Sequence, residues 1–247
     1  MENIMEIKRV SKKIKGRTII DNMSFEIKKG QICGFIGPNG AGKTTMIRLL
    51  TGLIKPNEGE ILINGIDVTN NRKEALINLG AIVESPIFFN YMTGKEVLSN
   101  LIRLHPNIPK KKRENRVEEV LKIVNLDKRG NDKVSTYSLG MKQRLGIAQA
   151  LLGNPEIIIL DEPANGLDPI GMKDLREIIL KLNREYNITF LVSSHLLDEL
   201  QKMCTNFVII NEGSLKFKGT SKDLFSIGSG NIEDIFIKIL DSQEALA

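Results

Sequence analysis

The sequence Gly37-Pro-Asn-Gly-Ala-Gly42-Lys43-Thr44 stands between a short apolar run of β type, ICGFI at residues 32–36, and a helix-like run, TMIRLLTGLI at residues 45–54. It fits the pattern G-x-x-x-x-G-K-[ST], in which a strand leads through a glycine-rich loop into a helix. Glycines let consecutive backbone N–H groups turn inward, and the helix N-terminus adds a partial positive charge. The stretch therefore predicts a nucleoside-triphosphate site on an α/β fold.

Each residue type in this loop has an expected contact with a nucleotide. Lys43 can reach the β- and γ-phosphates as a point charge, and the Thr44 hydroxyl can be a ligand of Mg²⁺. The alternative is an ordinary glycine-rich turn, which the flanking strand and helix disfavour. We expect a continuous set of residues to contact the nucleotide: Gly37, Pro38, Asn39, Gly40, Ala41, Gly42, Lys43, Thr44 and Thr45.

A second apolar run, residues 157–160, ends in two carboxylates, Asp161 and Glu162. Such a run is typical of a central parallel strand, and ligands of these folds bind at the carboxyl ends of strands. Neighbouring side chains on a strand point to opposite sides, so the two acids are expected to differ in role. We assign Asp161 to the Mg²⁺ shell and Glu162 to polarising the attacking water. The alternative is that Asp-Glu-Pro ends the strand in a surface turn.

His195 follows a further apolar run, ITFLVSS at residues 188–194, and so lies just beyond the carboxyl end of a predicted strand. From there an imidazole can hydrogen-bond a γ-phosphate and orient the water, although a purely structural histidine is the alternative. The other histidine, His105 in RLHPNIP, is interpreted as a residue at a helix end.

The order of the predicted elements is that of an α/β sheet with a helical insertion. Residues 86–153 lack strand signals and are predicted to be helical, with one helix opened by the capping-box sequence Thr93-Gly-Lys-Glu96. Gly228-Ser-Gly230 predicts a small hinge before a last amphipathic helix. The other predicted elements are strands within 4–36, at 59–66, 157–161 and 188–193, helices at 43–54, 110–125, 170–185, 195–204 and 232–240, and a hairpin at 207–217.

Composition excludes some classes of protein. The chain has 247 residues, 41% of them apolar and 26% charged, which is ordinary for a folded α/β protein. No apolar run approaches the roughly 18 residues of a transmembrane helix, and the first residues lack the apolar core of a signal peptide. We therefore expect a cytoplasmic chain. Cys33 and Cys204 are far apart in apolar segments and are expected to be inert buried thiols.

The formal charge of +5 suits an anionic partner, but such a balance is common among unrelated enzymes. The densest basic run, Lys110 to Arg113, opens a helix-like segment. It is interpreted as a solvated helix end, with a phosphate or RNA patch as the less favoured alternative. No nucleic-acid partner is expected.

Between the phosphate loop and the acidic strand lies Tyr137-Ser-Leu-Gly-Met-Lys-Gln-Arg144, at the head of a helix-like run. Ser138 is a good N-cap, and the helix that it opens has a positive end suited to a phosphate. Together with the phosphate loop, Asp161-Glu162, Gly166-Leu-Asp168 and Ser194-His195, this segment resembles the ABC ATPase family, over about residues 5–220. The resemblance implies a P-loop NTPase fold of ABC type, with an N-terminal antiparallel β part, a parallel-sheet core and a helical subdomain.

The resemblance also implies domain bounds and partners. The nucleotide-binding domain spans residues 4–220, with the helical subdomain inserted at about 86–153, and residues 221–247 form a C-terminal helical tail. Two subunits, expected to be a homodimer, face head to tail, and each ATP lies between the phosphate loop of one and the serine-headed helix of the other. Polytopic transmembrane permease subunits contact the helical subdomain, at the inner face of the cell membrane.

In this arrangement, residues of the serine-headed helix are expected to contact the nucleotide of the partner subunit: Ser138, Gly140, Met141 and Gln143. Asp168 is expected to cross to the partner and link the two sites. ATP then holds the dimer closed, and hydrolysis lets it open, which drives transport.

Four positions, in three places of the chain, depart from the commonest family pattern. Glu84 stands where most members carry glutamine; a carboxylate there is a harder Mg²⁺ ligand than an amide, and it resembles the lantibiotic-immunity and bacitracin-resistance branch of peptide exporters. Leu139 and Met141 in SLGMKQ are variants familiar among the same exporters. Ile14 stands where an aromatic ring commonly stacks on adenine, so a weaker contact with the base is expected.

The sequence therefore predicts the ATPase subunit of an exporter that removes an antimicrobial peptide of lantibiotic or bacitracin type. The alternative is the ATPase of another ABC exporter or permease. A soluble ABC protein that acts on ribosomes or DNA is less favoured, because the chain has one uninterrupted cassette. A non-hydrolysing regulatory cassette is disfavoured by four intact residues: Lys43, Asp161, Glu162 and His195.

Overall fold

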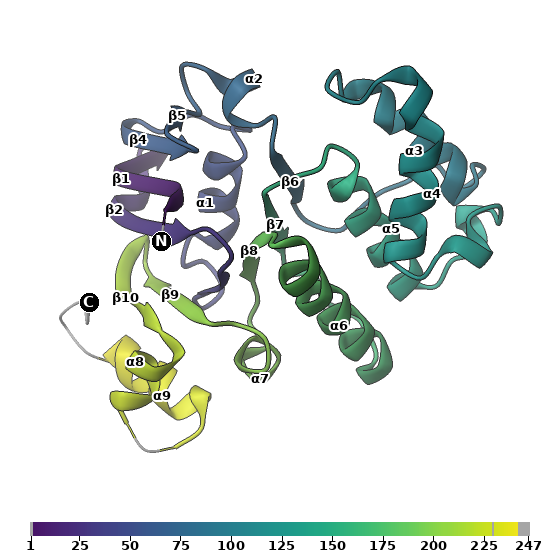
Figure 1. Ribbon diagram of the computed structural model, residues 1–247. Coiled ribbons are helices and arrows are strands. Elements are labelled where there is room, and N and C mark those ends of the chain that lie inside the picture. The colour runs from purple at the N-terminus through teal and green to yellow at the C-terminus, as the bar shows by residue number, and fades with distance from the viewer. Residues whose placement is uncertain (1, 229, 242–247) are drawn as a thin grey trace.

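The strands form two sheets of different kinds (Figure 1). The structure, a computed structural model, describes residues 2–228 and 230–241. The first sheet is antiparallel throughout, in the order β2-β1-β4-β5. Its strands are β1 (Asn3–Ile14), β2 (Arg17–Lys28), β4 (Glu58–Ile63) and β5 (Ile66–Asp67). The expected N-terminal antiparallel part is thus confirmed.

The second sheet is parallel except for one edge strand, and its order is β10-β9-β3-β8-β7-β6. Every residue of β3, β7 and β8 is buried, which explains their continuous apolar sequences. Because these three strands are parallel, their carboxyl ends meet at one edge of the sheet. The bounds are β3 (Ile32–Ile36), β6 (Leu79–Ile82), β7 (Ile157–Asp161), β8 (Thr189–Ser193), β9 (Asn206–Asn211) and β10 (Ser214–Thr220).

Helices cover both faces of the second sheet. Ile158 of β7 lies in one core cluster with residues of α6, and its neighbour Ile159 lies in the other cluster with residues of α1. Since alternate residues of a strand point to opposite faces, α1 and α6 lie on opposite sides of the sheet. The helices around this core are α1 (Lys43–Leu50), α2 (Arg72–Ala75), α6 (Pro169–Tyr186) and α7 (Leu197–Gln201).

A helical layer, defined here as residues 86–153, lies on the side away from the antiparallel sheet (Figure 1). Its main helices are α3 (Gly94–Leu101), α4 (Arg113–Ile123) and α5 (Leu139–Leu151), which pack on one another, and α5 also packs against β6. The predicted capping box is present, since Thr93 and Glu96 exchange hydrogen bonds at the start of α3. Short 3₁₀ turns complete the layer: η1 (Ile102–Leu104), η2 (Lys110–Lys112), η3 (Asp127–Arg129) and η4 (Val134–Thr136).

Two short helices follow β10, namely α8 (Ser221–Ser226) and α9 (Ile232–Asp241). The predicted amphipathic character of the last helix is confirmed, because Ile232, Ile235 and Ile239 of α9 are buried against the core. Ser229 of the expected hinge and residues 242–247 of the expected tail lie outside the described residues. Among the helices described, none combines the length and the apolar character needed to cross a bilayer.

Both cysteines are buried, as expected. Burial raises the pKa of the Cys33 thiol to about 12 and raises that of Cys204 well above its ordinary value. The thiolate, which is the nucleophilic form, is therefore strongly disfavoured at both positions, and neither cysteine has a chemical role in the site.

Candidate functional site

The glycine-rich loop joins β3 to α1 at the carboxyl edge of the parallel sheet. Gly40 and Gly42 have φ values of +84° and +104°, in the region that glycine adopts at little cost. Gly42 caps α1 without a side-chain hydrogen bond, and within the described residues no acceptor takes the N–H groups of Lys43, Thr44 or Thr45. Unpaired N–H groups at a helix N-terminus fit an anion such as a phosphate.

A pocket of about 530 Å³, which we call the phosphate pocket, lies over this loop. It brings together segments that follow β3, β7 and β8, as the meeting of their carboxyl ends requires. Nine of the predicted residues line it, together with two that were not predicted, Ile19 and Asn165. The predicted lining residues are Pro38, Asn39, Gly40, Gly42, Lys43, Thr44, Thr45, Glu162 and His195.

Two residues of the loop hold its shape and do not line the pocket. A Cβ added at Gly37 would lie 2.6 Å from the carbonyl oxygen of Ile210, so only glycine fits there. Ala41 is buried; its N–H donates to Pro38 O, and its carbonyl oxygen accepts from Gly213 N. The expected nucleotide contacts of these two residues stay a prediction.

The Lys43 ammonium is buried at the centre of the loop. Its Nζ donates to the carbonyl oxygens of Gly37 at 2.7 Å and Pro38 at 3.3 Å, and lies 3.8 Å from Glu162 Oε1. A fixed cation in this position is suited to bind the terminal phosphates of a nucleotide.

Glu162 and His195 meet at the ends of β7 and β8. His195 Nδ1 lies 2.7 Å from Glu162 Oε2, and the His195 N–H donates to the same oxygen at 3.3 Å. Glu162 has a φ of +48°, and its own N–H donates to the carbonyl and hydroxyl oxygens of Ser193. These bonds hold the Glu162 carboxylate in the pocket, between a lysine and a histidine.

The two neighbouring acids lie in different surroundings, as the strand geometry predicts. Asp161 is buried and accepts a hydrogen bond from Ser193 Oγ at 2.5 Å, whereas Glu162 lines the pocket. The alternative of a surface turn is therefore wrong for Asp161.

The three expected magnesium ligands lie in different surroundings. Thr44 lines the pocket, Asp161 is buried and does not line it, and Glu84 forms an ion pair with Arg48 of α1 at 2.5 Å. Their expected role at a shared Mg²⁺ stays a prediction. Within residues 2–228 and 230–241 no three carboxylate, histidine or cysteine side chains form a cluster suited to a metal. The hydroxyl and carboxylate oxygens nonetheless fit Mg²⁺, which commonly takes one or two protein oxygens beside phosphates and water.

A second pocket, of about 380 Å³, lies at the N-terminal end of α5, and we call it the Ser138 pocket. Ser138 is the N-cap of α5 and accepts from Met141 N at 3.2 Å, and Asp168 caps α6 by accepting from Gly171 N at 2.8 Å. Ser138, Gly140 and Asp168 line this pocket, whereas Met141 and the buried Gln143 do not. The two pockets share no lining residue. One chain thus presents two separate pockets, each at a helix N-terminus.

Ile14 lies at the end of β1 and is 41% exposed, outside the lining of the phosphate pocket. Ile19 of β2 lines the pocket instead. Its sequence context, TII, is that of an ordinary core strand, so no sequence signal distinguishes it. The sequence could have indicated that Asn165 lines the pocket, because this residue lies between Glu162 and Asp168, in the segment that links the two predicted sites.

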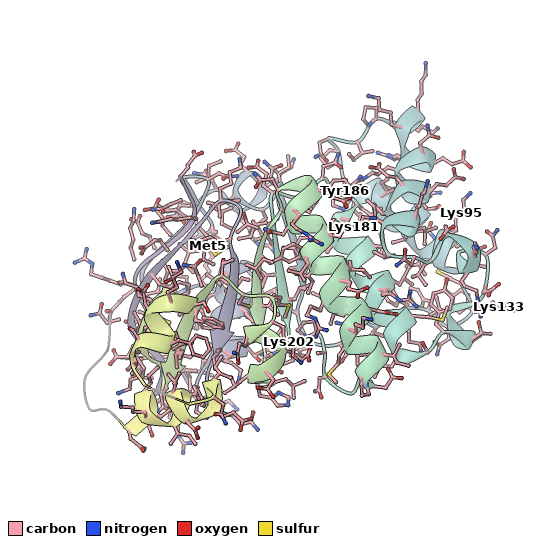
Figure 2. All side chains as sticks on the ribbon, turned by 60° about the horizontal axis from the view of Figure 1, so that its bottom comes forward. Met5, Lys95, Lys133, Lys181, Tyr186 and Lys202 are labelled. Carbon is pink, nitrogen blue, oxygen red and sulfur yellow. The ribbon has the colours of Figure 1, made fainter. Side chains whose placement is uncertain are left out.

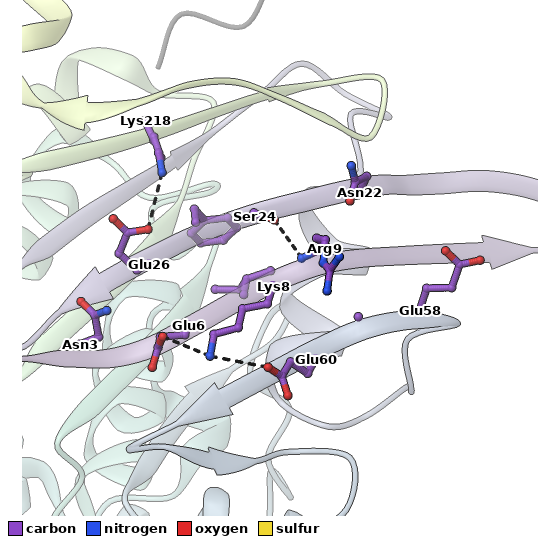
Figure 3. A pocket seen from close by; sticks show the side chains of 13 residues that line it. Asn3, Glu6, Lys8, Arg9, Asn22, Ser24, Glu26, Glu58, Glu60 and Lys218 are labelled. Atoms are coloured by element: carbon purple, nitrogen blue, oxygen red, sulfur yellow. Dashed lines mark hydrogen bonds and ion pairs between the residues drawn. The ribbon is translucent and has the colours of Figure 1, made fainter.

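A larger hollow, of about 930 Å³, lies elsewhere, on the outer face of the antiparallel sheet (Figure 3). Its charged side chains largely pair with one another: Lys8 lies 3.4 Å from Glu6 and 3.6 Å from Glu60, and Lys218 lies 3.6 Å from Glu26. Because these charges are compensated within the sheet, we assign no chemistry to this hollow.

A strand, a glycine-rich loop and a helix, with a glutamate and a histidine at the ends of adjacent strands, define the site of a P-loop nucleoside triphosphatase. A model of the ABC transporter family matches residues 20–165. The chain belongs to this family, as an ATP-binding subunit that hydrolyses ATP in coupling to transport.

Similar proteins of known family support this assignment to the ABC transporter family. An uncharacterized ABC transporter ATP-binding protein of Bacillus subtilis, YhcH, is 46% identical over 87% of this chain and 69% of its own length. The bacitracin transport ATP-binding protein BcrA of Bacillus licheniformis is 45% identical over 87% of this chain and 69% of its own length. The lantibiotic transport ATP-binding protein SrtF of Streptococcus pyogenes is 34% identical over 94% of this chain and 96% of its own length.

Solved structures agree on the fold. The ATP-binding subunit of an ABC transporter superposes with a TM-score of 0.84 at 28% identity, over 96% of this chain and all of that one. A dimeric ATP-binding cassette in a post-hydrolysis state, bound to ADP and Pi, superposes with a TM-score of 0.77 at 26% identity, over 87% of this chain and 98% of that one.

Proposed function

We propose that this subunit drives the export of an antimicrobial peptide of lantibiotic or bacitracin type, through transmembrane permease subunits, and so gives resistance or immunity. The observation that carries the proposal is the similarity to bacitracin and lantibiotic transport proteins over most of the chain. Glu84 and the SLGMKQ segment, which resemble this branch of exporters, support it independently of overall identity.

In the proposed reaction the chain's own residues bind the triphosphate and activate water. The N–H groups of the loop and Lys43 hold the phosphates, Glu162 accepts the proton of the attacking water, and His195 keeps the water and the γ-phosphate oriented. Thr44 and Asp161 would hold Mg²⁺, with Glu84 as a further ligand. A bound Mg²⁺ ion supplies neutralisation of the charge on the β- and γ-phosphates.

We propose that the active unit is a pair of copies, in which the Ser138 pocket of one chain closes over the phosphate pocket of the other. The separation of the two pockets within one chain supports this arrangement. So does the dimeric state of the cassette that binds ADP and Pi. Asp168, which lines the second pocket, would then lie at the contact between the copies and link the two sites.

The proposed permease contact lies in the segment that follows Glu84, at the start of the expected helical subdomain. Three large apolar side chains are exposed there: Ile87 at 94%, Phe89 at 65% and Tyr91 at 70%. The rings of Phe89 and Tyr91 lie 5.5 Å apart. An exposed apolar cluster of this kind is typical of a protein–protein contact, and we call these three residues the docking cluster.

A resistance assay tests the proposal. The gene is deleted in its native host and restored as wild type or as the Lys43→Ala variant, and growth is measured against graded doses of bacitracin and of a lantibiotic. We expect the deletion and the Lys43→Ala strain to be inhibited at clearly lower doses of one of these peptides than the wild type, because loss of the loop cation weakens ATP binding.

The assay also includes a control compound and a further variant strain. A ribosome-targeting antibiotic of unrelated structure is the control compound, and its inhibitory dose is expected to be unchanged. A Glu84→Gln strain is expected to shift the dose for the same peptide, since the substitution removes both the carboxylate and its ion pair with Arg48. Equal doses of both peptides for the deletion and wild-type strains would contradict the export of these peptides.

A further inference from the structure

A groove of about 750 Å³ runs between α3 and α4 on the helical layer, and most of its charged lining is basic. Lys95, Arg103, Lys110 and Arg113 line it, beside a single carboxylate, Glu114. Lys111 and Lys112 continue the basic run beyond the groove. The η1 and η2 turns bring these residues together although they are up to eighteen positions apart in the sequence.

Four of these cations are exposed and also have no ionic partner among the described residues. Arg103, Lys110, Lys111 and Lys112 are exposed, and no carboxylate in the described part of the chain lies within 4.0 Å of them. Lys95 differs, because it lies 2.9 Å from Glu118 and 3.7 Å from Glu114. Lys110, Lys111 and Lys112 are thus exposed at the start of a helical segment, as the sequence predicts, and in addition a groove lies beside them.

The surroundings of the four cations are apolar. Leu104, directly after Arg103, is 76% exposed, and the buried Ile102 and Val117 form the floor of the groove. No aromatic side chain lines the groove, so it lacks the stacking platform on which single-stranded nucleic acids are held. Exposed cations together with an exposed leucine on one part of a surface are instead typical of contact with the interface of an anionic membrane.

The groove also lies near the proposed permease contact. α3 begins three residues after Tyr91 of the docking cluster, and Lys95 is in its first turn. Figure 2 shows Lys95 at the outer part of the helical layer, and Lys181 on a different helix, α6. A permease bound at the docking cluster would therefore lie next to the start of α3, which contributes Lys95 to the basic groove.

We propose that Arg103, Lys110, Lys111 and Lys112 bind anionic lipid headgroups at the membrane surface, with Leu104 entering the interface between them. The subunit then contacts the lipid directly, beside its contact with the permease. This contact orients the helical layer and is independent of which molecule the transporter moves.

A vesicle assay tests the proposal on the full-length chain. Large unilamellar vesicles of phosphatidylcholine, or of phosphatidylcholine with phosphatidylglycerol, are sedimented with the protein at low and at moderate salt. We expect binding only to the anionic vesicles, and weaker binding at higher salt. Each cation near an anionic surface contributes about fivefold to partitioning, so replacing all four with glutamine is expected to lower binding by tenfold or more.

A matched variant controls for overall charge. Replacing Lys173, Lys181, Lys216 and Lys222 with glutamine removes the same four charges from the formal +5, outside the helical layer. We expect this variant to bind the anionic vesicles as the wild type does. Equal losses in both variants, undiminished binding by the first variant, or no preference of the wild type for anionic vesicles would overturn the proposal.

A second binding experiment tests nucleic acid as the alternative anionic ligand of the groove. Single-stranded RNA that binds through the same four cations, with the wild type failing to bind anionic vesicles, would assign the groove to nucleic acid and overturn the lipid contact. Because the assay contains no permease and no transported peptide, a negative result would leave the export function untouched.

Discussion

Among single residues, Glu162 is held in the most constrained position of the phosphate pocket. A φ of +48° is uncommon for a residue with a Cβ and costs on the order of 1 kcal/mol or more, yet hydrogen bonds with Ser193 and His195 maintain this conformation. The backbone strain turns the carboxylate toward Lys43 and His195. Strain of this kind is typical of functional positions.

The Glu162→Gln variant is expected to lose about a hundredfold or more of its ATP turnover, because an amide cannot accept the proton of the attacking water. Binding of ATP is expected to be retained, since the loop and Lys43 are unchanged. The ATP-bound pair of copies should therefore accumulate. Phosphate release measures the first effect, and size-exclusion chromatography with and without ATP measures the second.

Glu156 provides a matched control for this substitution. It directly precedes the amino end of β7, where it lies 2.8 Å from Lys29, and the same change to glutamine there leaves the pocket untouched. Turnover by the Glu156→Gln variant is expected to be close to that of the wild type. Brisk hydrolysis by Glu162→Gln would remove Glu162 from the role of base.

Residues of the phosphate pocket could be predicted where a spacing pattern or a strand end marks them. Lys43, Glu162 and His195 were found in this way, and the structure brings them into one pocket. Ile19 and Arg48 could not be found. Contact of Ile19 with the pocket depends on how β2 crosses over the loop, and pairing of Arg48 with Glu84 joins residues 36 positions apart through tertiary packing.

At the level of elements, the long periodic segments were predictable and the short ones were not. The buried strands β7 and β8 and helix α6 agree with the sequence reading to within one residue at each end. Strand β6 was missed because its four residues, LGAI, include Gly80, which weakens any strand signal. The glycine is required by packing: a Cβ there would lie 2.5 Å from Ala150 O of α5.

Other element predictions need correction at their ends. The expected helix 110–125 begins as the 3₁₀ turn η2, and α4 proper spans Arg113–Ile123. The expected helix 195–204 shortens to Leu197–Gln201, and the expected helical tail from residue 221 contains α8 as well as α9. The expected strand 59–66 divides into β4 and β5 at the turn Asn64-Gly65, where both residues have positive φ. Helix and strand ends depend on local hydrogen bonds that periodicity does not encode.

The contact between the end of η1 and the end of α5 contains a group that titrates. His105 directly follows η1, which confirms its interpretation as a residue at a helix end. Its imidazole packs so closely on Gly153 that an added Cβ there would lie 2.6 Å from Nδ1. Burial lowers the pKa of His105 below its ordinary value of 6.5, and the positive charge of Arg116 lowers it further.

A lowered folded-state pKa means that protonation of His105 favours the unfolded chain. The stabilising effect of neutral His105 is present above pH 6.5 and is lost as the pH falls below 6.5 through the folded-state pKa. We therefore expect the urea midpoint of the wild type to fall between about pH 7.5 and about pH 5.5. The His105→Gln variant, which cannot be protonated, should show a smaller fall. His195→Gln is the control, because His195 is half exposed, and an equal fall in wild type and His105→Gln would contradict this prediction.

For the whole molecule, the main consequence of the fold is that the phosphate pocket and the Ser138 pocket are separate surfaces of one chain. Each pocket contains a helix N-terminus suited to an anion: the start of α1 in one, and the start of α5 in the other. A head-to-tail pair of identical chains would bring one pocket of each kind together twice. Such a pair would contain two complete sites, each built from one pocket of either chain.

Mixing two inactive variants tests this arrangement. Lys43→Ala removes the loop cation, and Gly140→Asp puts a negative charge at the head of α5, where there is room for a side chain because the nearest atom to an added Cβ is 3.9 Å away. Each variant alone is expected to be nearly inactive. In an equimolar mixture half of the pairs are mixed, and each mixed pair has one intact site, so about a quarter of wild-type turnover is expected to return.

The expected return of turnover in the mixture follows from how the two defects are distributed between the two sites of a mixed pair. In a mixed pair one site combines both defects, and the other combines the intact loop of the Gly140→Asp chain with the intact helix of the Lys43→Ala chain. A chain that completed its site alone would gain nothing from a differently damaged neighbour, because no exchange of pockets would occur. Absence of rescue, measured as phosphate release across a series of mixing ratios, would therefore rule out the shared site. A maximum at the equimolar ratio is expected if the site is shared.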